Sequence, residues 1–145
     1  MQFIHVGLLT PSLEKSIAEF SSFPGFEDKK WTIREVEFPP EAVLTGRGSH
    51  MRTAIADLNG AVFELIEPLD PASYHSNELR RKGPGLHHTA FICLENQAEA
   101  VRAQLDRGGK IVWEADYKGN HPIYVESADG TQVWEFINYV PGPPE

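Results

Sequence analysis

The sequence is poor in cysteine and has no long apolar run. Cys93 is the only cysteine among the 145 residues, so an intramolecular disulfide is excluded. No segment approaches the roughly 20 consecutive apolar residues of a membrane-spanning helix, and the start of the chain lacks the charged and apolar regions of a signal peptide. We therefore expect a cytoplasmic protein without a membrane partner, in which Cys93 is a buried, inert thiol.

Positive charge is also scarce. The 13 Lys and Arg residues against 21 Asp and Glu residues give a formal net charge of −8, which argues against nucleic acid or an anionic membrane as the partner. The longest basic run, Arg80-Arg81-Lys82, fits a solvated surface better than a contact with an anionic substrate tail. The length and a hydrophobic share of 41% favour one compact domain.

The order of expected elements occurs twice along the chain. Leu13, Ile17 and Phe20 recur at helical spacing, and a second helical pattern covers residues 97–107 up to the helix stop Gly108-Gly109. Strand-like segments are expected at residues 3–9, 29–38, 51–57, 61–67, 86–94, 110–117, 123–127 and 131–139. The proline-rich residues 141–144 are expected to form an exposed tail. Each half thus predicts a strand, a helix and three further strands.

The two halves also agree in detail. Asn59-Gly60 precedes Val62-Phe63-Glu64-Leu65-Ile66, and Asp129-Gly130 precedes Val133-Trp134-Glu135-Phe136-Ile137. Each is a hairpin turn signal followed by an apolar strand with one carboxylate in its middle. The repetition predicts a duplicated module of about 60–70 residues. The modules would occupy about residues 1–68 and 86–139, within one domain, with a polar connector at residues 69–85 that is able to swing over a site.

Glu64 and Glu135 require an explanation because an unpaired carboxylate among apolar side chains is expensive to bury. Strand alternation places Glu64 with Val62 and Ile66, and Glu135 with the matching residues of the second half. A single such acid would be interpreted as an edge-strand residue, solvated or paired with Arg34 or Arg52. Two acids at equivalent repeat positions favour a functional role.

Histidines complete the pattern. His5 is third in the first strand and His88 is third in Leu86-His87-His88, so each opens its half as a glutamate closes it. A set of two imidazoles and two carboxylates suits Ni²⁺, Zn²⁺, Co²⁺, Mn²⁺ or Fe²⁺. His87 would point to the opposite strand face and is interpreted as structural. His50, His75 and His121 have no repeat counterpart, and only His121 is a candidate for substrate contact.

At these residues the sequence resembles the vicinal oxygen chelate superfamily, which includes glyoxalase I and methylmalonyl-CoA epimerase. Ile4-His5-Val6-Gly7 looks like its opening strand, and Phe63-Glu64-Leu65-Ile66-Glu67-Pro68 is similar to its first closing strand. Asp129-Gly130 before Trp134-Glu135-Phe136 resembles the glyoxalase ending, whereas residues 83–91, Gly-Pro-Gly-Leu-His-His-Thr-Ala-Phe, look epimerase-like. The resemblance implies an α+β fold of two tandem βαβββ modules that form a curved mixed sheet, or partial barrel, around a divalent metal held by His5, Glu64, His88 and Glu135.

The resemblance also implies chemistry at carbon next to a carbonyl. The order His-Glu-His-Glu matches bacterial glyoxalase I, because epimerases commonly have Gln where this chain has Glu64. The main expectation is therefore a metal-dependent lyase or isomerase of the glyoxalase I type, with an acyl-CoA epimerase as the alternative. The metal would stabilise an enolate or enediolate oxygen, Glu135 would be the general base and ligand, and Glu64 would return the proton. Val62, Phe63, Trp134 and Phe136 would form an apolar pocket for a thiol adduct or an acyl-CoA.

Three further interpretations remain open. An extradiol dioxygenase of the same superfamily uses two His and one carboxylate on iron, and a fourth protein ligand would leave too few open positions. A drug-binding resistance protein of this fold usually lacks the metal ligands. The His and Glu residues could also simply pair with each other in an unrelated module. A homodimer is expected, with sites built within one chain or between two.

Overall fold

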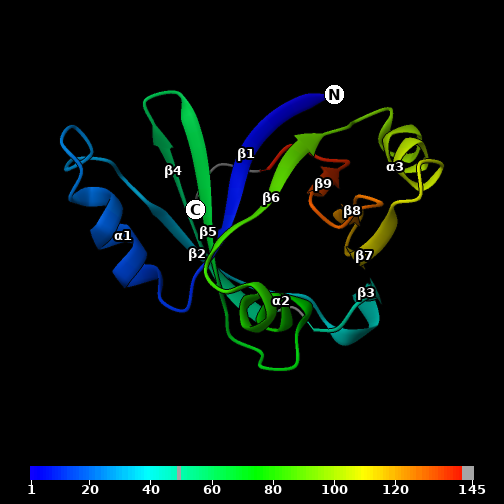
Figure 1. Ribbon diagram of the computed structural model, residues 1–145, viewed down its shortest axis with the longest axis horizontal. Coiled ribbons are helices and arrows are strands. Elements are labelled where there is room, and N and C mark those ends of the chain that lie inside the picture. Colours follow the sequence, from blue (N-terminus) through cyan, green and yellow to red (C-terminus); the bar gives the residue numbers. More distant parts are fainter. Residues whose placement is uncertain (49, 142–145) are drawn as a thin grey trace.

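The computed structural model describes residues 1–48 and 50–141, so residues 142–144 of the expected tail lie outside the described residues. Its strands form a single curled, mixed sheet (Figure 1). The strands are β1 (Gln2–Leu9), β2 (Thr32–Glu37), β3 (Val43–Thr45), β4 (His50–Leu58), β5 (Ala61–Pro68), β6 (Gly85–Ile92), β7 (Lys110–Ala115), β8 (Ile123–Glu126) and β9 (Val133–Ile137). The helices are α1 (Leu13–Ser21), α2 (Tyr74–Lys82) and α3 (Gln97–Leu105), and a short 3₁₀ turn covers Pro40–Ala42.

The sheet has the strand order β2-β4-β5-β1-β6-β9-β8-β7-β3. β1 and β6 are antiparallel neighbours at its centre, and each has the last strand of its own half as a parallel neighbour, β5 for β1 and β9 for β6. The two halves are therefore arranged alike around the β1–β6 seam. The predicted α+β fold of βαβββ modules in a partial barrel is confirmed.

Strand alternation separates a helix-covered face from a pocket face. On β5, Leu65 packs with Leu13 of α1 and Ala54 of β4, whereas the neighbouring Glu64 lines a pocket. On β9, Phe136 packs against Val101 of α3, and the neighbouring Glu135 lines the same pocket. The helices α1 and α3 thus flank the two halves on the side away from the pocket (Figure 1).

The connector between the halves differs from its prediction. Residues 69–85 contain α2, which Ser73 caps by accepting a hydrogen bond from the Ser76 N–H. Leu79 of this helix packs with Leu9, Met51 and Ile66 of the first half. Tyr74 of the same helix packs with a buried cluster of the second half. The connector therefore contains a helix that packs against both halves.

The short strand β3 was also not expected. It pairs antiparallel with β7 through Val43 and Thr45, which extends the sheet beyond the second half. Three residues carry too little periodicity to be recognised as a strand. Within the described part of the chain, no helix is long and apolar enough to cross a membrane.

Candidate metal centre

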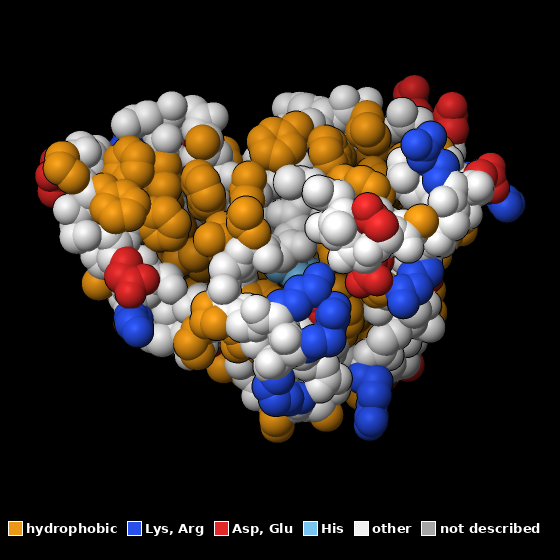
Figure 2. Space-filling model, viewed as in Figure 1, with side chains coloured by type: hydrophobic (Ala, Val, Ile, Leu, Met, Phe, Trp, Pro, Cys, Tyr) orange, Lys and Arg blue, Asp and Glu red, His pale blue; other side chains and the backbone are white. Residues whose placement is uncertain are grey.

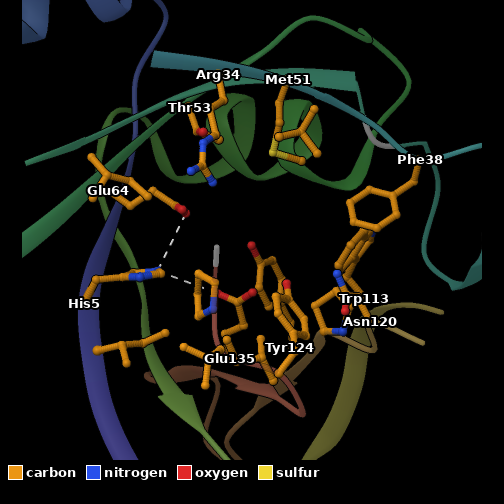
Figure 3. A pocket seen from close by; sticks show the side chains of 18 residues that line it. His5, Arg34, Phe38, Met51, Thr53, Glu64, Trp113, Asn120, Tyr124 and Glu135 are labelled. Atoms are coloured by element: carbon orange, nitrogen blue, oxygen red, sulfur yellow. Dashed lines mark ion pairs between the residues drawn. The ribbon is translucent and has the colours of Figure 1, made fainter. Parts of the chain in front are cut away.

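Three of the four predicted ligand residues, His5, Glu64 and Glu135, line one end of a pocket (Figure 3). The fourth, His88, does not line it but lies within 4.0 Å of each of the other three. His5 Nε2 lies 3.3 Å from His88 Nε2 and 3.6 Å from Glu64 Oε1. Glu135 Oε2 lies 3.1 Å from His88 Nε2 and 3.7 Å from His5 Nε2. Each half thus contributes one imidazole from its first strand and one carboxylate from its last strand to a single point.

The central seam explains this convergence. β1 and β6 are direct neighbours, with His5 paired to Ala90 and His88 paired to Gly7, so the two imidazoles meet diagonally across the seam. β5 and β9 flank these two strands on either side. Gly7 is the register partner of His88, and a methyl group on Gly7 would overlap the His88 ring. The missing side chain at Gly7 therefore makes the space that the imidazole occupies, a role that the sequence alone did not indicate.

The donor set fits a divalent transition metal. Bonds of about 2.0–2.2 Å in a tetrahedron or octahedron separate neighbouring ligand atoms by about 3.0–3.5 Å, and opposite ones by about 4.2 Å. The distances from the two histidines to each other and to the two carboxylates range from 3.1 Å to the 4.0 Å between His88 Nε2 and Glu64 Oε1. Among the described residues, His5, Glu64 and His88 offer ligand atoms that all lie within 4.8 Å of one another. Glu135 lies 3.7 Å from His5 and 3.1 Å from His88 but is not part of this group of three, so its role as a fourth ligand stays a prediction.

The two carboxylates differ in their electrostatic environment. Burial raises the pKa of Glu64 above its usual value, and the charge of Glu135 adds to this although His5 opposes it. Burial also acts to raise the pKa of Glu135, but the hydrogen bond from His88 and the nearby imidazoles outweigh it, so the pKa is lowered. In the metal-free protein, Glu135 therefore holds the negative charge more readily than Glu64 does.

The pocket beside these residues has a volume of about 290 Å³. Figure 3 shows Arg34, Thr53 and Met51 along one wall, with Phe38 and Trp113 at the far side from His5. Further lining residues are Ile4, Val36, Ile55, Asn120, Pro122, Tyr124, Ile137, Tyr139, Val140 and Pro141. An apolar, partly aromatic chamber thus adjoins a polar end.

The predicted composition of this pocket was wrong. Phe63 contacts Phe20 of α1, and both Phe136 and Trp134 pack in the cluster beneath α3. Val62 is likewise not among the residues found along the pocket wall. These residues flank the two glutamates in sequence, so strand alternation turns Phe63, Phe136 and Trp134 to the opposite face. The apolar wall comes instead from other strands, with Val36 of β2, Ile55 of β4 and Trp113 of β7.

His87 has more contacts than its structural interpretation implied. It is buried, its Nδ1 lies 2.9 Å from Nδ1 of His88 and its Nε2 lies 3.0 Å from the Tyr74 hydroxyl. Burial lowers the pKa of His87 well below its usual value, with a further lowering by His88. The sequence shows two adjacent histidines, but regular strand alternation predicts that their rings lie on opposite faces of the sheet. The contact between them therefore could not be predicted from the sequence.

Other predicted contacts have partners outside the pocket. His121 Nε2 lies 2.7 Å from Glu114 Oε1, and its neighbours Asn120 and Pro122 line the pocket instead. Arg52 pairs with Glu14 and Glu67, not with either central glutamate. In the basic run, Arg81 and Lys82 pair with Glu78. Figure 2 shows the Lys and Arg side chains of this region gathered over α2.

The sequence matches the profile of the glyoxalase/bleomycin resistance protein/dioxygenase superfamily over residues 4–125. The chain belongs to this superfamily. Among proteins of curated function, none matches the sequence significantly. The match covers the first half and most of the second, so it includes His5, Glu64 and His88, whereas Glu135 on β9 lies beyond it.

Solved structures share the fold at low sequence identity. A hypothetical protein from Bacillus halodurans is 17% identical with a TM-score of 0.68, over 99% of this chain and 98% of that one. Methylmalonyl-CoA epimerase from Mycobacterium tuberculosis is 18% identical with a TM-score of 0.66, over 97% and 89%. A methylmalonyl-CoA epimerase from Streptomyces coelicolor, in complex with 2-nitronate-propionyl-CoA, is 17% identical with a TM-score of 0.65, over 94% and 96%.

Proposed function

We propose that the protein is a metal-dependent isomerase that moves a proton at the carbon next to an acyl-CoA carbonyl, in the manner of an epimerase. The observation that carries this proposal is the placement of two carboxylates on either side of one imidazole, with Glu64 3.6 Å and Glu135 3.7 Å from His5 Nε2, on strands related across the seam. Inversion at carbon requires proton removal from one face and delivery to the other. The fold shared with methylmalonyl-CoA epimerases supports the choice of substrate class.

His5, Glu64, His88 and Glu135 are the residues that would hold the metal. A bound divalent cation supplies Lewis-acid stabilisation of the negative charge that develops on the carbonyl oxygen. The protein itself must then position the substrate carbon and move the proton. Glu135 is proposed to accept the proton and Glu64, its counterpart in the other half, to return one, because inversion requires a carboxylate for each direction of transfer.

The pocket is suited to the acyl group rather than to the whole coenzyme. Its volume of about 290 Å³ lies at the lower end of the range for small-molecule sites. Apolar side chains such as Ile55, Trp113 and Ile137 exclude water around the reacting carbon. Arg34 faces the same space (Figure 3), and a guanidinium there favours an acyl group that bears a carboxylate.

The experiment that tests the function follows exchange of the substrate α-hydrogen in deuterated water, using metal-loaded protein and each enantiomer of a 2-methyl-branched, carboxylate-bearing acyl-CoA. Wild type is expected to exchange and to invert. Glu135→Gln keeps an oxygen ligand but cannot accept the proton, so turnover should fall by roughly 10²-fold or more. With two bases, Glu135→Gln should still exchange one enantiomer without inverting it, through Glu64.

Glu64→Gln is the matched variant and should retain exchange of the other enantiomer. Full activity of Glu135→Gln would place the base elsewhere. Failure of the loaded wild type to exchange either enantiomer would reject the epimerase function.

A glyoxalase I-type lyase is the second candidate, favoured by the carboxylate at Glu64 within the ligand set. The hemithioacetal of methylglyoxal with a thiol tests it under the same exchange conditions. Cleavage of a catechol with O₂ by the iron-loaded protein, with neither exchange reaction, would support the dioxygenase interpretation instead.

A further inference from the structure

We infer that His87, together with Tyr74, is a positioning residue that sets which ring nitrogen of His88 carries the proton, so that Nε2 is left free to bind the metal. The inference rests on the proposed metal centre, and it concerns a row of three side chains that we call the histidine relay: Tyr74, His87 and His88. Its two contacts are 3.0 Å from the Tyr74 hydroxyl to His87 Nε2 and 2.9 Å from His87 Nδ1 to His88 Nδ1. The far nitrogen of His88 is the one that faces Glu135 and His5.

An irregularity in β6 allows two adjacent histidines to touch. Gly7 pairs with His88 and Leu8 pairs with Leu86, so His87 has no register partner on β1. This extra residue is a bulge, which re-aims a side chain that a regular strand would turn away. The His87 and His88 rings consequently approach edge to face, with their centroids 5.1 Å apart.

The contacts leave two proton arrangements. When His88 donates its Nε2–H to Glu135, its Nδ1 must accept from His87 Nδ1–H, and His87 Nε2 then accepts from the Tyr74 hydroxyl. When His88 Nε2 binds a metal, its Nδ1–H donates to His87 Nδ1, and His87 Nε2–H donates to the Tyr74 oxygen. Both arrangements hold one proton on each neutral ring and one on the hydroxyl, so only the direction of the hydrogen bonds reverses.

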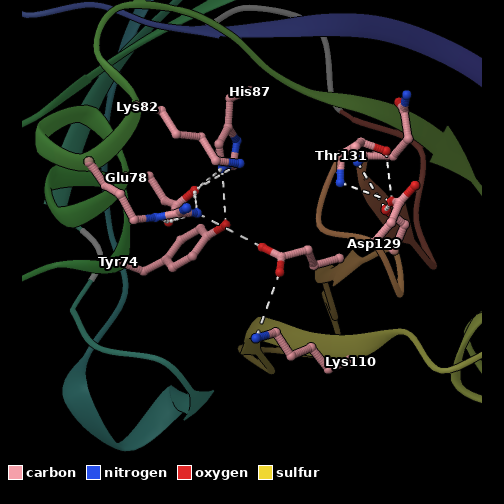
Figure 4. Close-up of polar contacts among 11 residues, drawn as sticks. Tyr74, Glu78, Lys82, His87, Lys110, Asp129 and Thr131 are labelled. Atoms are coloured by element: carbon pink, nitrogen blue, oxygen red, sulfur yellow. Dashed lines mark hydrogen bonds and ion pairs between the residues drawn. The ribbon is translucent and has the colours of Figure 1, made fainter.

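Two carboxylates beside the relay act in opposite directions: in the metal-free protein Glu135 favours the first arrangement, and Glu78 favours the second. Glu78 Oε2 lies 4.0 Å from His87 Nε2, and a carboxylate there attracts the ring proton to that nitrogen (Figure 4). Glu78 is itself held by Arg81 and Lys82 of the same helix. The histidine rings are buried, so bulk water does not readily replace these hydrogen bonds. Such outer partners orient a ligating histidine and raise its affinity for the metal.

The test compares zinc affinities by competition with a chromophoric chelator. His87→Leu removes the acceptor for the His88 Nδ1–H, and the dissociation constant should rise by about 10- to 100-fold. His87→Asn restores an acceptor oxygen near the position of Nδ1 and should bind more tightly than His87→Leu. Tyr74→Phe should weaken binding, whereas Tyr117→Phe, which removes a hydroxyl from an exposed ring outside the relay, should leave it unchanged.

Imidazole ¹⁵N spectra of the wild type read the proton positions without any substitution. In the zinc-loaded protein, His88 should carry its proton on Nδ1 and His87 on Nε2. A His87 proton on Nδ1 in that state would overturn the inference, as would equal zinc affinity of His87→Leu and wild type. Failure of the wild type to bind zinc, nickel or cobalt at all would instead remove the metal centre, so the two failures are distinguishable.

Discussion

At the scale of single residues, the proposed metal centre depends on Gly7 as well as on His88, because the His88 ring occupies the space that a side chain at Gly7 would fill. Gly7→Ala would push a methyl group into the His88 ring. We expect a loss of stability of about 1–3 kcal/mol from overpacking and metal binding at least tenfold weaker, because the ring must move away from its position. Denaturant unfolding and zinc titration measure the two effects.

A double variant supplies the control for Gly7. If the His88 ring is the obstacle, adding His88→Ala should remove most of the stability cost of Gly7→Ala, since the space then becomes free. Equal costs in both backgrounds would show that the alanine disturbs the backbone and not the imidazole. His88→Ala alone should abolish metal binding while the chain still folds.

The sequence predicts the convergence of His5, Glu64, His88 and Glu135 because each residue has a counterpart at the equivalent place in the other half. Repetition makes an otherwise ordinary histidine or glutamate informative. His87 and Gly7 have contacts that depend on a bulge and on a cross-strand register. Neither feature leaves a periodic pattern, so their roles are visible only in three dimensions.

At the scale of elements, α2 shows where periodicity fails as a guide. Tyr-His-Ser-Asn-Glu-Leu-Arg-Arg-Lys is almost wholly polar, so the sequence predicts a loop. The helix forms because Ser73 caps it and because Tyr74, His75 and Leu79 are covered by both halves of the sheet. The other two helices, α1 and α3, are predictable from the sequence because apolar residues recur at helical spacing along one face of each.

His75 makes the docking of α2 sensitive to acid. Burial lowers its pKa from 6.5 to about 3, so the unfolded chain binds a proton that the folded protein does not. Stability should therefore fall as the pH decreases below about 6.5, by about 1.4 kcal/mol per pH unit at most and by about 2 kcal/mol at pH 5. Urea unfolding of the metal-free protein at several pH values measures this slope, which should become shallower in His75→Leu.

His50 provides a control of opposite sign. A hydrogen bond to Glu35 raises the pKa of this exposed histidine, so its contribution is present at low pH and is lost as the pH rises through the raised pKa. His50→Gln should remove that small contribution and leave the acid-side loss from His75 in place. An unchanged pH slope in His75→Leu would mean that another buried group dominates the acid response.

At the scale of the whole molecule, metal binding should stabilise both halves together, because each half supplies two of the four side chains. One divalent ion per chain is expected after expression with added metal, as measured by elemental analysis. At a free ion concentration about 100 times the dissociation constant, stabilisation is about 2.7 kcal/mol, or a rise in Tm of about 5–10 °C for a chain of this size.

Calorimetry with and without a chelator measures this rise, and His88→Ala should show none. Absence of bound metal, together with an unchanged Tm on adding Ni²⁺, Zn²⁺ or Co²⁺, would contradict the metal centre. The division at residues 1–68 and 86–139 and the expected homodimer stay predictions. Sedimentation of the loaded protein would measure the oligomeric state.

The position of β1 has a consequence for synthesis of the chain. It lies between β5 and β6 in the sheet, yet His5 is separated from His88 by 83 positions. At about 5–20 residues per second, the ribosome needs about 4–17 seconds to reach the second histidine after the first. The strand at the centre of the finished sheet thus emerges before its neighbours exist. Until then the apolar side chains of β1 are exposed to chaperones. The pairing of β1 with β6 is necessarily a late event of biosynthesis.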